Sequence, residues 1–406
     1  MLAIYIFFFG AWFIYNYRIY GINVSTFIIG LYLLSAISGF ILLYAFDFYD
    51  PERILVKAIF THIICLFLFL YPVVYVGNKG LKNVIFPGFT QLRYLIFILI
   101  FLGLVTIITS VENVQKVFSF TDLSEARKLY NAREIDVTST GIFGYLAGIG
   151  THLAYYSIFF FFYLLAFFPQ KKLLIVLLFI SSFGNIFYNL SAMGRDGLVR
   201  WMLFIIINYL LYKDYLSISL KAKIKKMSFI PLVAILLVFF MITFSRFGDR
   251  QQGVMFYIFD YIGQQNIYFS YNFDQFFEGA AGGRLNFGYF LGDSISMNNL
   301  NDIFYADYHL NTFSTFVGSF YFDTGFLTTL LLSIFFYIIS FCFIKIGKFT
   351  FTKFVVFLIF LEIELLGIFY YMFYAPTRIN TLLLLIIISF CIYFISKYKS
   401  TLIKIR

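Results

Sequence analysis

A short turn near the middle of the chain holds residues that are well suited to bind an anion. The segment Ser191-Ala-Met-Gly-Arg-Asp-Gly197 places Arg195 and Asp196 between two glycines, and Arg200 follows shortly afterwards. Glycine allows a ligand to approach closely, and the planar guanidinium group of arginine matches the geometry of phosphate oxygens. The turn therefore predicts a phosphate-binding site that includes Arg195 and Arg200. The alternative is an Arg195–Asp196 ion pair at a membrane surface that binds no ligand.

Two further arginines stand four residues apart in the segment Ser245-Arg-Phe-Gly-Asp-Arg250. If a helix continues through this segment, Arg246 and Arg250 lie on the same face of it. Two guanidinium groups on one face can neutralise a pyrophosphate, which a single one cannot do. We therefore expect both arginines to contribute to an anion site. The alternative is that they anchor the chain to lipid headgroups.

A third candidate group lies in the segment from His309 to Gly325, which includes Asn311 and Asp323. His309 is the only histidine expected outside the apolar segments, and an imidazole can act as a general base near neutral pH. Asn311 and Asp323 are candidates for hydrogen bonds to sugar hydroxyls. A lone histidine is also common as a structural hydrogen-bonding group, and Asp323 could instead cap a helix.

Four more charged residues complete the set of candidates. Arg284 follows two glycines in a polar segment, and Arg378 lies close to Pro376 at the start of the last apolar segment. Both are candidate ligands of a phosphate or a glycan, and Arg378 could join the other arginines. Glu362 and Glu364 lie within an apolar segment, where a carboxyl group is costly unless it is paired or faces a cavity.

The elements that carry these residues are predicted to be membrane-spanning helices. Hydrophobic residues make up 62% of the 406 residues, charged residues only 12%, and the mean hydropathy is +0.89. Soluble proteins carry roughly twice that share of charge, so the composition indicates an all-α polytopic membrane protein. A helix needs about 20 apolar residues to cross a bilayer. By this measure we expect about eleven spans (10–12), near residues 2–17, 23–46, 54–76, 93–110, 142–168, 172–191, 198–213, 229–245, 325–346, 354–374 and 379–396.

The distribution of basic residues predicts how these spans are oriented. One set of alternate connections is short and carries 18 of the 30 lysines and arginines, so it is expected on the cytoplasmic side. The N-terminus is then outside and the C-terminus inside. Of the 20 acids, 17 fall on the outer side, so arginines kept there stand out. The groups at Arg195, Arg246 and His309 are all predicted to lie on this outer side.

Two outer connections are predicted to be long loops within a single membrane domain that covers residues 1–406. The smaller loop is residues 111–141. The larger is residues 246–324, which are rich in Tyr, Phe, Asn, Asp and Gly. Because a loop of about eighty residues is unusual in a compact fold and generally carries function, we expect the larger loop to take part in the site.

The motifs that would indicate a cofactor are missing from the sequence. It contains no Walker A sequence, no HExxH motif, no cluster of metal ligands and no DxD in the outer connections, so we expect neither a metal nor another cofactor. The net charge of +10 is explained by membrane orientation, so nucleic acid is not an expected partner. A site on the outer side cannot use cytoplasmic ATP or nucleotide sugars. Its substrate must therefore be activated already, for example on a lipid carrier, or require no activation.

These residues and their layout resemble the bacterial O-antigen polymerase (Wzy-type) family, the oligosaccharide repeat-unit polymerases. The resemblance rests on the glycine–arginine turn at 194–195, on the arginines at the start of the larger loop, and on the run from Asn311 to Gly325 before the next span. It covers the topology of the whole chain, with local motifs over about forty residues. One departure is Asp323-Thr-Gly325, where members of the family often have Asp-Phe-Gly.

The resemblance implies a GT-C-like helical scaffold and an inverting, metal-independent glycosyltransferase in the bacterial inner membrane. The growing glycan would move from undecaprenyl pyrophosphate to a second lipid-linked repeat unit at the periplasmic face. Besides these undecaprenyl-pyrophosphate-linked oligosaccharides and the lipid bilayer, a chain-length regulator protein would be a partner. By similarity to the related O-antigen ligases, the catalytic residues would be Arg195, Arg246 and His309, with Arg250 as an alternative to Arg246. The residues that would bind pyrophosphate or glycan are Arg250, Arg200, Arg378, Arg284, Asp323 and Asn311.

Three other functions are compatible with the sequence. An O-antigen ligase would perform the same chemistry on a different acceptor, lipid A-core. A lipid-linked oligosaccharide flippase would line a cavity within the spans with basic residues and have short connections on both faces, and a general transporter would have broken helices in paired positions. The length of the 246–324 segment and the lack of a visible internal repeat favour a transferase.

Overall fold

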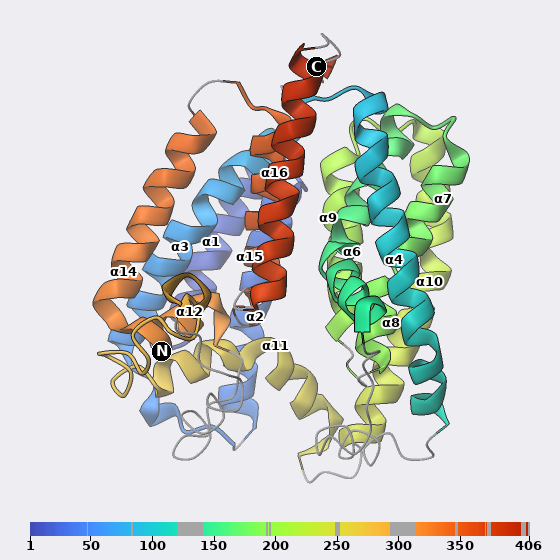
Figure 1. The fold of residues 1–406 in the computed structure, drawn as a ribbon. Helices are drawn as coiled ribbons and strands as arrows, with labels where there is room; N and C mark the ends of the chain where they lie inside the picture. The colour runs from blue at the N-terminus through green and yellow to red at the C-terminus, as the bar shows by residue number, and fades with distance from the viewer. Residues whose placement is uncertain are drawn as a thin grey trace. The chain divides into compact units, whose positions relative to one another are not determined.

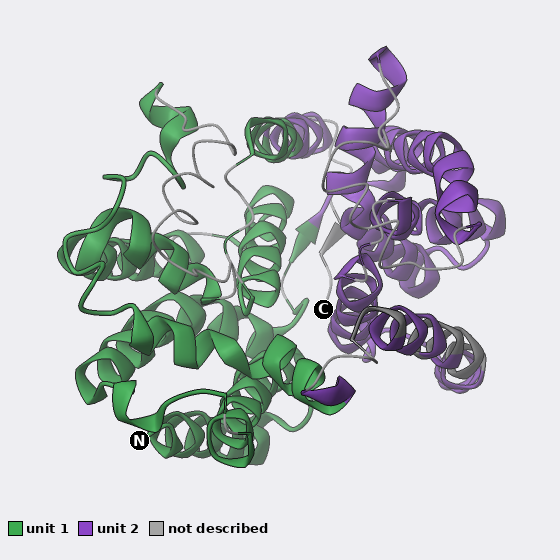
Figure 2. Cartoon of the chain, turned by 90° about the horizontal axis from the view of Figure 1, so that it is seen from below, with its two compact units in different colours: residues 1–85, 255–386, 404–406 green, residues 86–254, 387–403 purple. Residues whose placement is uncertain are grey.

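The structure, a computed structural model, describes residues 1–46, 48–82, 84–119, 141–191, 194, 196–247, 252–292, 314–345, 348–369, 371, 375–398 and 403–404. Nearly all of these residues lie in α-helices (Figure 1). The chain divides into two compact units, which Figure 2 shows in different colours. Unit 1 comprises residues 1–85, 255–386 and 404–406, and unit 2 comprises residues 86–254 and 387–403. Both units consist of apolar helices, and the single membrane domain over residues 1–406 stays a prediction.

Unit 1 is built from helices of both the N-terminal and the C-terminal part of the chain. Its elements are α1 (Ala3–Tyr20), α2 (Val24–Ala45), the 3-10 helix η1 (Pro51–Arg53), α3 (Val56–Lys79), nearly all of α11 (Gly253–Tyr271), α12 (Gly288–Leu291), α14 (Thr315–Lys345), α15 (Phe351–Leu366) and the first residues of α16 (Pro376–Tyr398). Helix α3 packs against α1, α2, α14 and α15. Buried hydrogen bonds join three of these helices, since His62 Nδ1 lies 2.7 Å from Tyr5 Oη and His62 Nε2 lies 2.8 Å from Thr315 Oγ1.

Unit 2 consists mainly of the middle of the chain. Its helices are α4 (Phe89–Phe118), α6 (Gly141–Phe167), α7 (Lys172–Ser181), α8 (Gly184–Ser191), α9 (Asp196–Tyr212) and α10 (Ile218–Phe247), together with the remainder of α16. Helix α4 packs against α6, α7 and α8, while α9 packs against α6 and α8. The approach of α4 and α6 requires a glycine, because a side-chain carbon at Gly150 would collide with the carbonyl oxygen of Leu102. Small residues at such contacts are typical of helix packing in membranes.

The chain is a multi-pass membrane protein. Among the described residues, seven helical segments are long and apolar enough to cross a bilayer: α2, α3, α4, α6, residues 172–191, α14 and α16. Each of the other four expected spans also contains a helix, namely α1, α9, α10 or α15, although α9 and α15 have only 17 and 16 residues. The membrane class and the helical fold are therefore confirmed. The number of eleven spans, the GT-C-like arrangement and the orientation of the termini stay predictions. Two strands of two residues each, β1 (Ile85–Phe86) and β2 (Ile403–Lys404), pair with each other.

The two predicted loops contain more helix than the sequence indicated. Helix α4 continues to Phe118, so the first residues of the predicted loop 111–141 are helical. The described part of the predicted loop 246–324 contains α11 and α12, and α14 begins at Thr315, well before the expected start of that span. Hydropathy does not predict α11 as a span, because the helix carries the polar residues Gln264, Gln265 and Asn266. These three side chains are buried within unit 1 rather than exposed.

Candidate functional site

The structure describes four of the nine predicted site residues in full. These are Arg200, Arg284, Asp323 and Arg378. Arg246 lies near the end of α10, and only its backbone is described. Four predicted residues lie outside the described part of the chain, and their roles stay predictions: Arg195, Arg250, His309 and Asn311.

The turn between α8 and α9 brings polar residues of both helices together in unit 2. The backbone amide of Gly194 donates a hydrogen bond to the carbonyl oxygen of Asn189 at 2.7 Å, at the end of α8. Gly197, in the first turn of α9, lies so close to Asn189 that a side-chain carbon there would be 2.8 Å from the Asn189 Cβ. Gly197 therefore allows α8 and α9 to meet, whereas the sequence indicated that it would admit a ligand.

Arg200 is buried and forms an ion pair with Asp196, which lies one turn earlier on α9. The Arg200 side chain is 7% exposed and the Asp196 side chain is 29% exposed, so the acid is the more accessible partner. Asp196 Oδ1 also accepts a hydrogen bond from the backbone amide of Gly197 at 3.0 Å. A carboxylate in this first turn is further stabilised by the helix dipole. An Arg195–Asp196 pair, the alternative considered from the sequence, stays untested because Arg195 lies outside the described residues.

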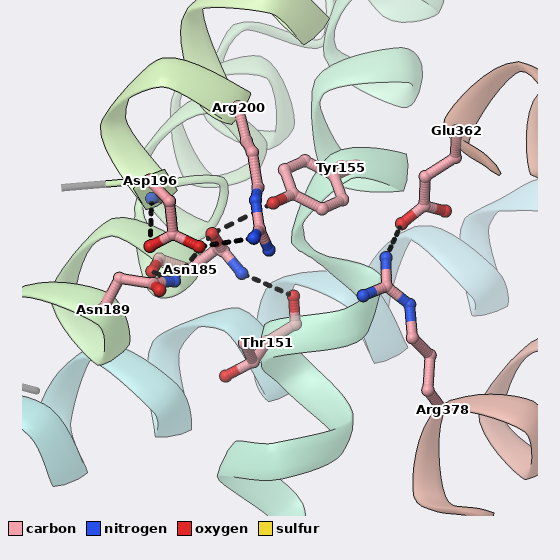
Figure 3. Close-up of polar contacts among 9 residues, drawn as sticks. Thr151, Tyr155, Asn185, Asn189, Asp196, Arg200, Glu362 and Arg378 are labelled. Atoms are coloured by element: carbon pink, nitrogen blue, oxygen red, sulfur yellow. Dashed lines mark hydrogen bonds and ion pairs between the residues drawn. The ribbon is translucent and has the colours of Figure 1, made fainter. Parts of the chain in front are cut away.

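Asparagine and tyrosine side chains lie beside this ion pair (Figure 3). Asn185 Oδ1 accepts hydrogen bonds from Tyr155 Oη and from Asn189 Nδ2, each at 3.1 Å. Asn185 Nδ2 donates to the carbonyl oxygen of Thr151 at 3.3 Å. These hydrogen bonds join α6 and α8, and the close approach of Gly197 to Asn189 places α9 against α8. We call the group the Arg200 cluster, and it consists of Tyr155, Asn185, Asn189, Asp196 and Arg200.

Aromatic rings pack on the helices that carry the Arg200 cluster. Tyr155 stacks on Phe204 with ring centroids 4.2 Å apart. Trp201 stacks on Phe183 with centroids 4.9 Å apart, and its Nε1 donates to Ser182 Oγ at 3.0 Å. Because charges interact more strongly in such low-dielectric surroundings than in water, an anion that reached Arg200 would be held more firmly than at an open surface.

Arg378 has a different environment, in unit 1. Its Nη2 donates to Glu362 Oε1 at 2.5 Å, and the two side chains are only 5% and 1% exposed (Figure 3). Glu362 belongs to α15 and Arg378 to α16, so the pair links two helices. The expectation that an acid in an apolar segment is paired is confirmed for Glu362.

Asp323 holds a loop of unit 1 against α14. Its carboxylate accepts hydrogen bonds from the backbone amides of Gly283 and Asn286, both at 2.9 Å, and from Asn286 Nδ2 at 3.0 Å. Asp323 is fully buried and lies two residues before Gly325, whose non-helical backbone divides α14, and its carboxylate bonds to the 283–286 loop. Arg284 lies in the same loop with an exposed side chain, and its Nε donates to the carbonyl oxygen of Ala281 at 3.1 Å. We therefore assign Asp323 a structural role.

The sequence reasoning missed Tyr155, Asn185 and Asn189. A signal was present, because Asn185 and Asn189 are polar residues spaced four apart in an apolar stretch and therefore share one helix face. Polar side chains within membrane helices need partners and often mark functional sites. No group of three or more His, Cys, Asp and Glu side chains that could hold a metal ion occurs within the described ranges.

Comparison with known proteins gives no match: no protein-family model, no curated protein and no solved structure matches the chain. The resemblance to O-antigen polymerases therefore rests on the sequence features alone.

Proposed function

We propose that the chain is a glycosyltransferase of the O-antigen polymerase type, which joins lipid-linked oligosaccharides at the periplasmic face of the bacterial inner membrane. The donor is a glycan on undecaprenyl pyrophosphate, and the acceptor is a repeat unit on a second such carrier. The multi-pass helical fold, the resemblance in motifs and layout, and the Arg200 cluster support this proposal.

The observation that carries the proposal is the pairing of the buried Arg200 with the more accessible Asp196. The Asp196 carboxylate is an anion held by a guanidinium group, by a backbone amide and by the first turn of α9. A phosphate group has the same sign of charge and offers more acceptor oxygens, so it can replace Asp196 beside Arg200. Arg195 directly precedes Asp196 in the sequence, which adds a second cation to the same turn.

In the proposed reaction, a hydroxyl group of the acceptor sugar attacks the anomeric carbon of the donor glycan. A bond forms between that carbon and the acceptor oxygen while its bond to the pyrophosphate oxygen breaks, so the configuration inverts. The leaving pyrophosphate keeps the bonding electrons, and Arg200 stabilises the charge that develops on it. The hydroxyl proton passes to a base, for which His309 stays the predicted residue.

The direct test is extension of lipid-linked repeat units by the purified protein in liposomes. We expect longer lipid-linked chains and free undecaprenyl pyrophosphate from the wild-type protein, and neither product from Arg200→Gln. Arg93→Gln is the matched control, because Arg93 is an exposed arginine on α4 of the same unit. Absence of extension by a folded wild-type protein would refute the proposal.

A cellular test separates the proposed polymerase from the alternatives. In cells that carry Arg200→Gln, lipopolysaccharide should end at lipid A-core with a single repeat unit, because ligation and transport continue without polymerisation. Complete loss of O-antigen from the core would instead indicate a ligase or a flippase. A normal distribution of chain lengths would show that Arg200 has no part in the reaction.

A further inference from the structure

Unit 1 contains a cavity of about 240 Å³ that none of the predicted site residues lines. It lies among α3, α14, α15, Phe287 and Tyr371. Eight of its thirteen lining residues are aromatic and three are aliphatic, and the other two are Ser340 and Glu364. A cavity needs only about 10–15 Å³ to admit one water molecule, so this one is large enough for part of an organic ligand.

Glu364 is the residue in this cavity that most needs a ligand. It is 1% exposed, and neither of its carboxyl oxygens has a hydrogen-bond partner within the part of the chain that the structure describes. The Ser340 hydroxyl is buried without a partner in the same way. Glu362, two residues earlier on α15, is instead paired with Arg378. Because an unpartnered carboxyl group at membrane depth is costly, a ligand that forms a hydrogen bond with Glu364 would be favoured there.

The two polar residues of the cavity lie at different levels of α14 and α15. The rings of Phe336 and Phe360 lie 4.9 Å apart and mark one level at which the two helices meet. Ser340 follows Phe336 by one turn, and Glu364 follows Phe360 by one turn. Since α14 and α15 run in opposite directions (Figure 1), these two polar residues lie on opposite sides of the ring contact. Their separation along the helix axis is about 12 Å at 1.5 Å per residue, which suits a chain-like ligand.

The cavity reaches the exposed face of α14. Phe335 and Ile339 line it, and they are also 62% and 49% exposed. The neighbouring residues Leu331 and Ile338 are exposed as well. In a helix that crosses a membrane, such an apolar exposed face contacts lipid chains. A ligand can therefore enter sideways from the bilayer.

We infer that this cavity, the Glu364 slot, binds a single hydrocarbon chain that carries a hydroxyl group. The apolar walls contact the chain, and the Glu364 carboxyl group forms a hydrogen bond with the hydroxyl. The two carboxyl oxygens of Glu364 have almost no exposed surface in the structure, so the side chain has to rotate into the slot to reach the hydroxyl. A phosphate head group does not fit, since the described lining contains an acid and no basic residue. An alcohol is favoured over an amine because a neutral pair leaves no charge in the apolar interior.

Photolabelling of the purified full-length protein tests the class of ligand. A long-chain alcohol with a photoreactive group near its hydroxyl should crosslink to α14 and α15 at residues that line the slot, as mapped by mass spectrometry. An excess of 1-decanol should reduce this labelling at least tenfold, whereas decane and decylamine should reduce it much less. Equal competition by decane, or stronger competition by decylamine, would overturn the inference.

Three variants locate the binding site. Ile339→Trp should fill the slot and abolish labelling, whereas Ile338→Trp, at a neighbouring and similarly exposed residue that does not line the slot, should leave it unchanged. Glu364→Leu should weaken the competition by 1-decanol about threefold to tenfold, which is the effect of one lost hydrogen bond. The competition by decane should stay unchanged. Equal effects of the two tryptophans, or no effect of Glu364→Leu, would contradict the assignment. No glycan is present, so failure here leaves the proposed transferase activity unaffected.

Discussion

Arg200 in unit 2 and Arg378 in unit 1 are both buried and both paired with an acid, but the two pairs are built differently. Arg200 and Asp196 lie one turn apart on the same helix, and the acid is 29% exposed. Arg378 and Glu362 come from two helices, and the acid is 1% exposed. A ligand anion can displace a partly exposed acid from Arg200 without separating helices. The same exchange at Arg378 would break the contact between α15 and α16.

Burial of an arginine does not by itself indicate its role. Arg200 and Arg378 differ in the accessibility of the acid that pairs with them and in the presence of further polar side chains. Asn185, Asn189 and Tyr155 lie beside Arg200. We therefore expect loss of the Glu362–Arg378 pair to reduce stability, and loss of Arg200 to reduce activity.

The largest expected effect is on the stability of unit 1. Glu362→Leu should lower the free energy of unfolding by about 3–5 kcal/mol, because it removes the acid from a buried guanidinium group. The double variant Glu362→Leu/Arg378→Met should recover most of this loss, since it removes both charges. Thermal unfolding in detergent measures both effects. A loss below about 1 kcal/mol in the single variant would show that the pair does not hold the helices together.

The next effect is on catalysis in unit 2. Arg200→Gln should lower the rate of glycan transfer by about 10²–10³-fold, the usual consequence of losing a group that stabilises a developing negative charge. Its free energy of unfolding should change much less than that of Glu362→Leu, because Asp196 is partly exposed and can be hydrated. Rate and melting temperature are measured on the same preparation. Equal losses of stability in the two variants would remove the distinction between the pairs.

A smaller effect is expected for the asparagine beside Arg200. Asn185→Leu should destabilise the chain by about 0.5–1.5 kcal/mol per hydrogen bond lost, and it should lower the transfer rate less than Arg200→Gln. Asn208→Leu is the matched control, because Asn208 is a buried asparagine on α9 outside the Arg200 cluster. If Asn208→Leu lowered the rate as much as Asn185→Leu, the cluster would have no special part in the reaction.

Most of the helices could be predicted from the sequence because their signal is local. Length and hydropathy are properties of each segment alone, and every expected span contains a helix. The same reasoning placed Arg200 among the anion-binding candidates and predicted that Glu362 is either paired or faces a cavity. The local signal failed at α11, where Gln264, Gln265 and Asn266 are polar in sequence but buried by the rest of unit 1.

Contacts between distant residues could not be predicted. The Asp323 carboxylate binds amides of residues 283–286, which lie about forty positions earlier, so nothing near Asp323 in the sequence indicates its role. The hydrogen bond from Tyr155 to Asn185 likewise depends on the packing of α6 against α8. A glycine that allows two helices to meet looks the same in the sequence as one that allows a ligand to approach. The sequence alone therefore does not show that Gly197 serves the contact between α8 and α9.

Equilibrium binding of farnesyl pyrophosphate to the purified protein tests whether Arg200 exchanges its internal acid for a pyrophosphate. Asp196→Asn should bind it roughly two- to fivefold more tightly than wild type, because the competing carboxylate is neutralised. Arg200→Gln should bind it at least tenfold more weakly. Equal affinity in all three proteins would contradict the claim.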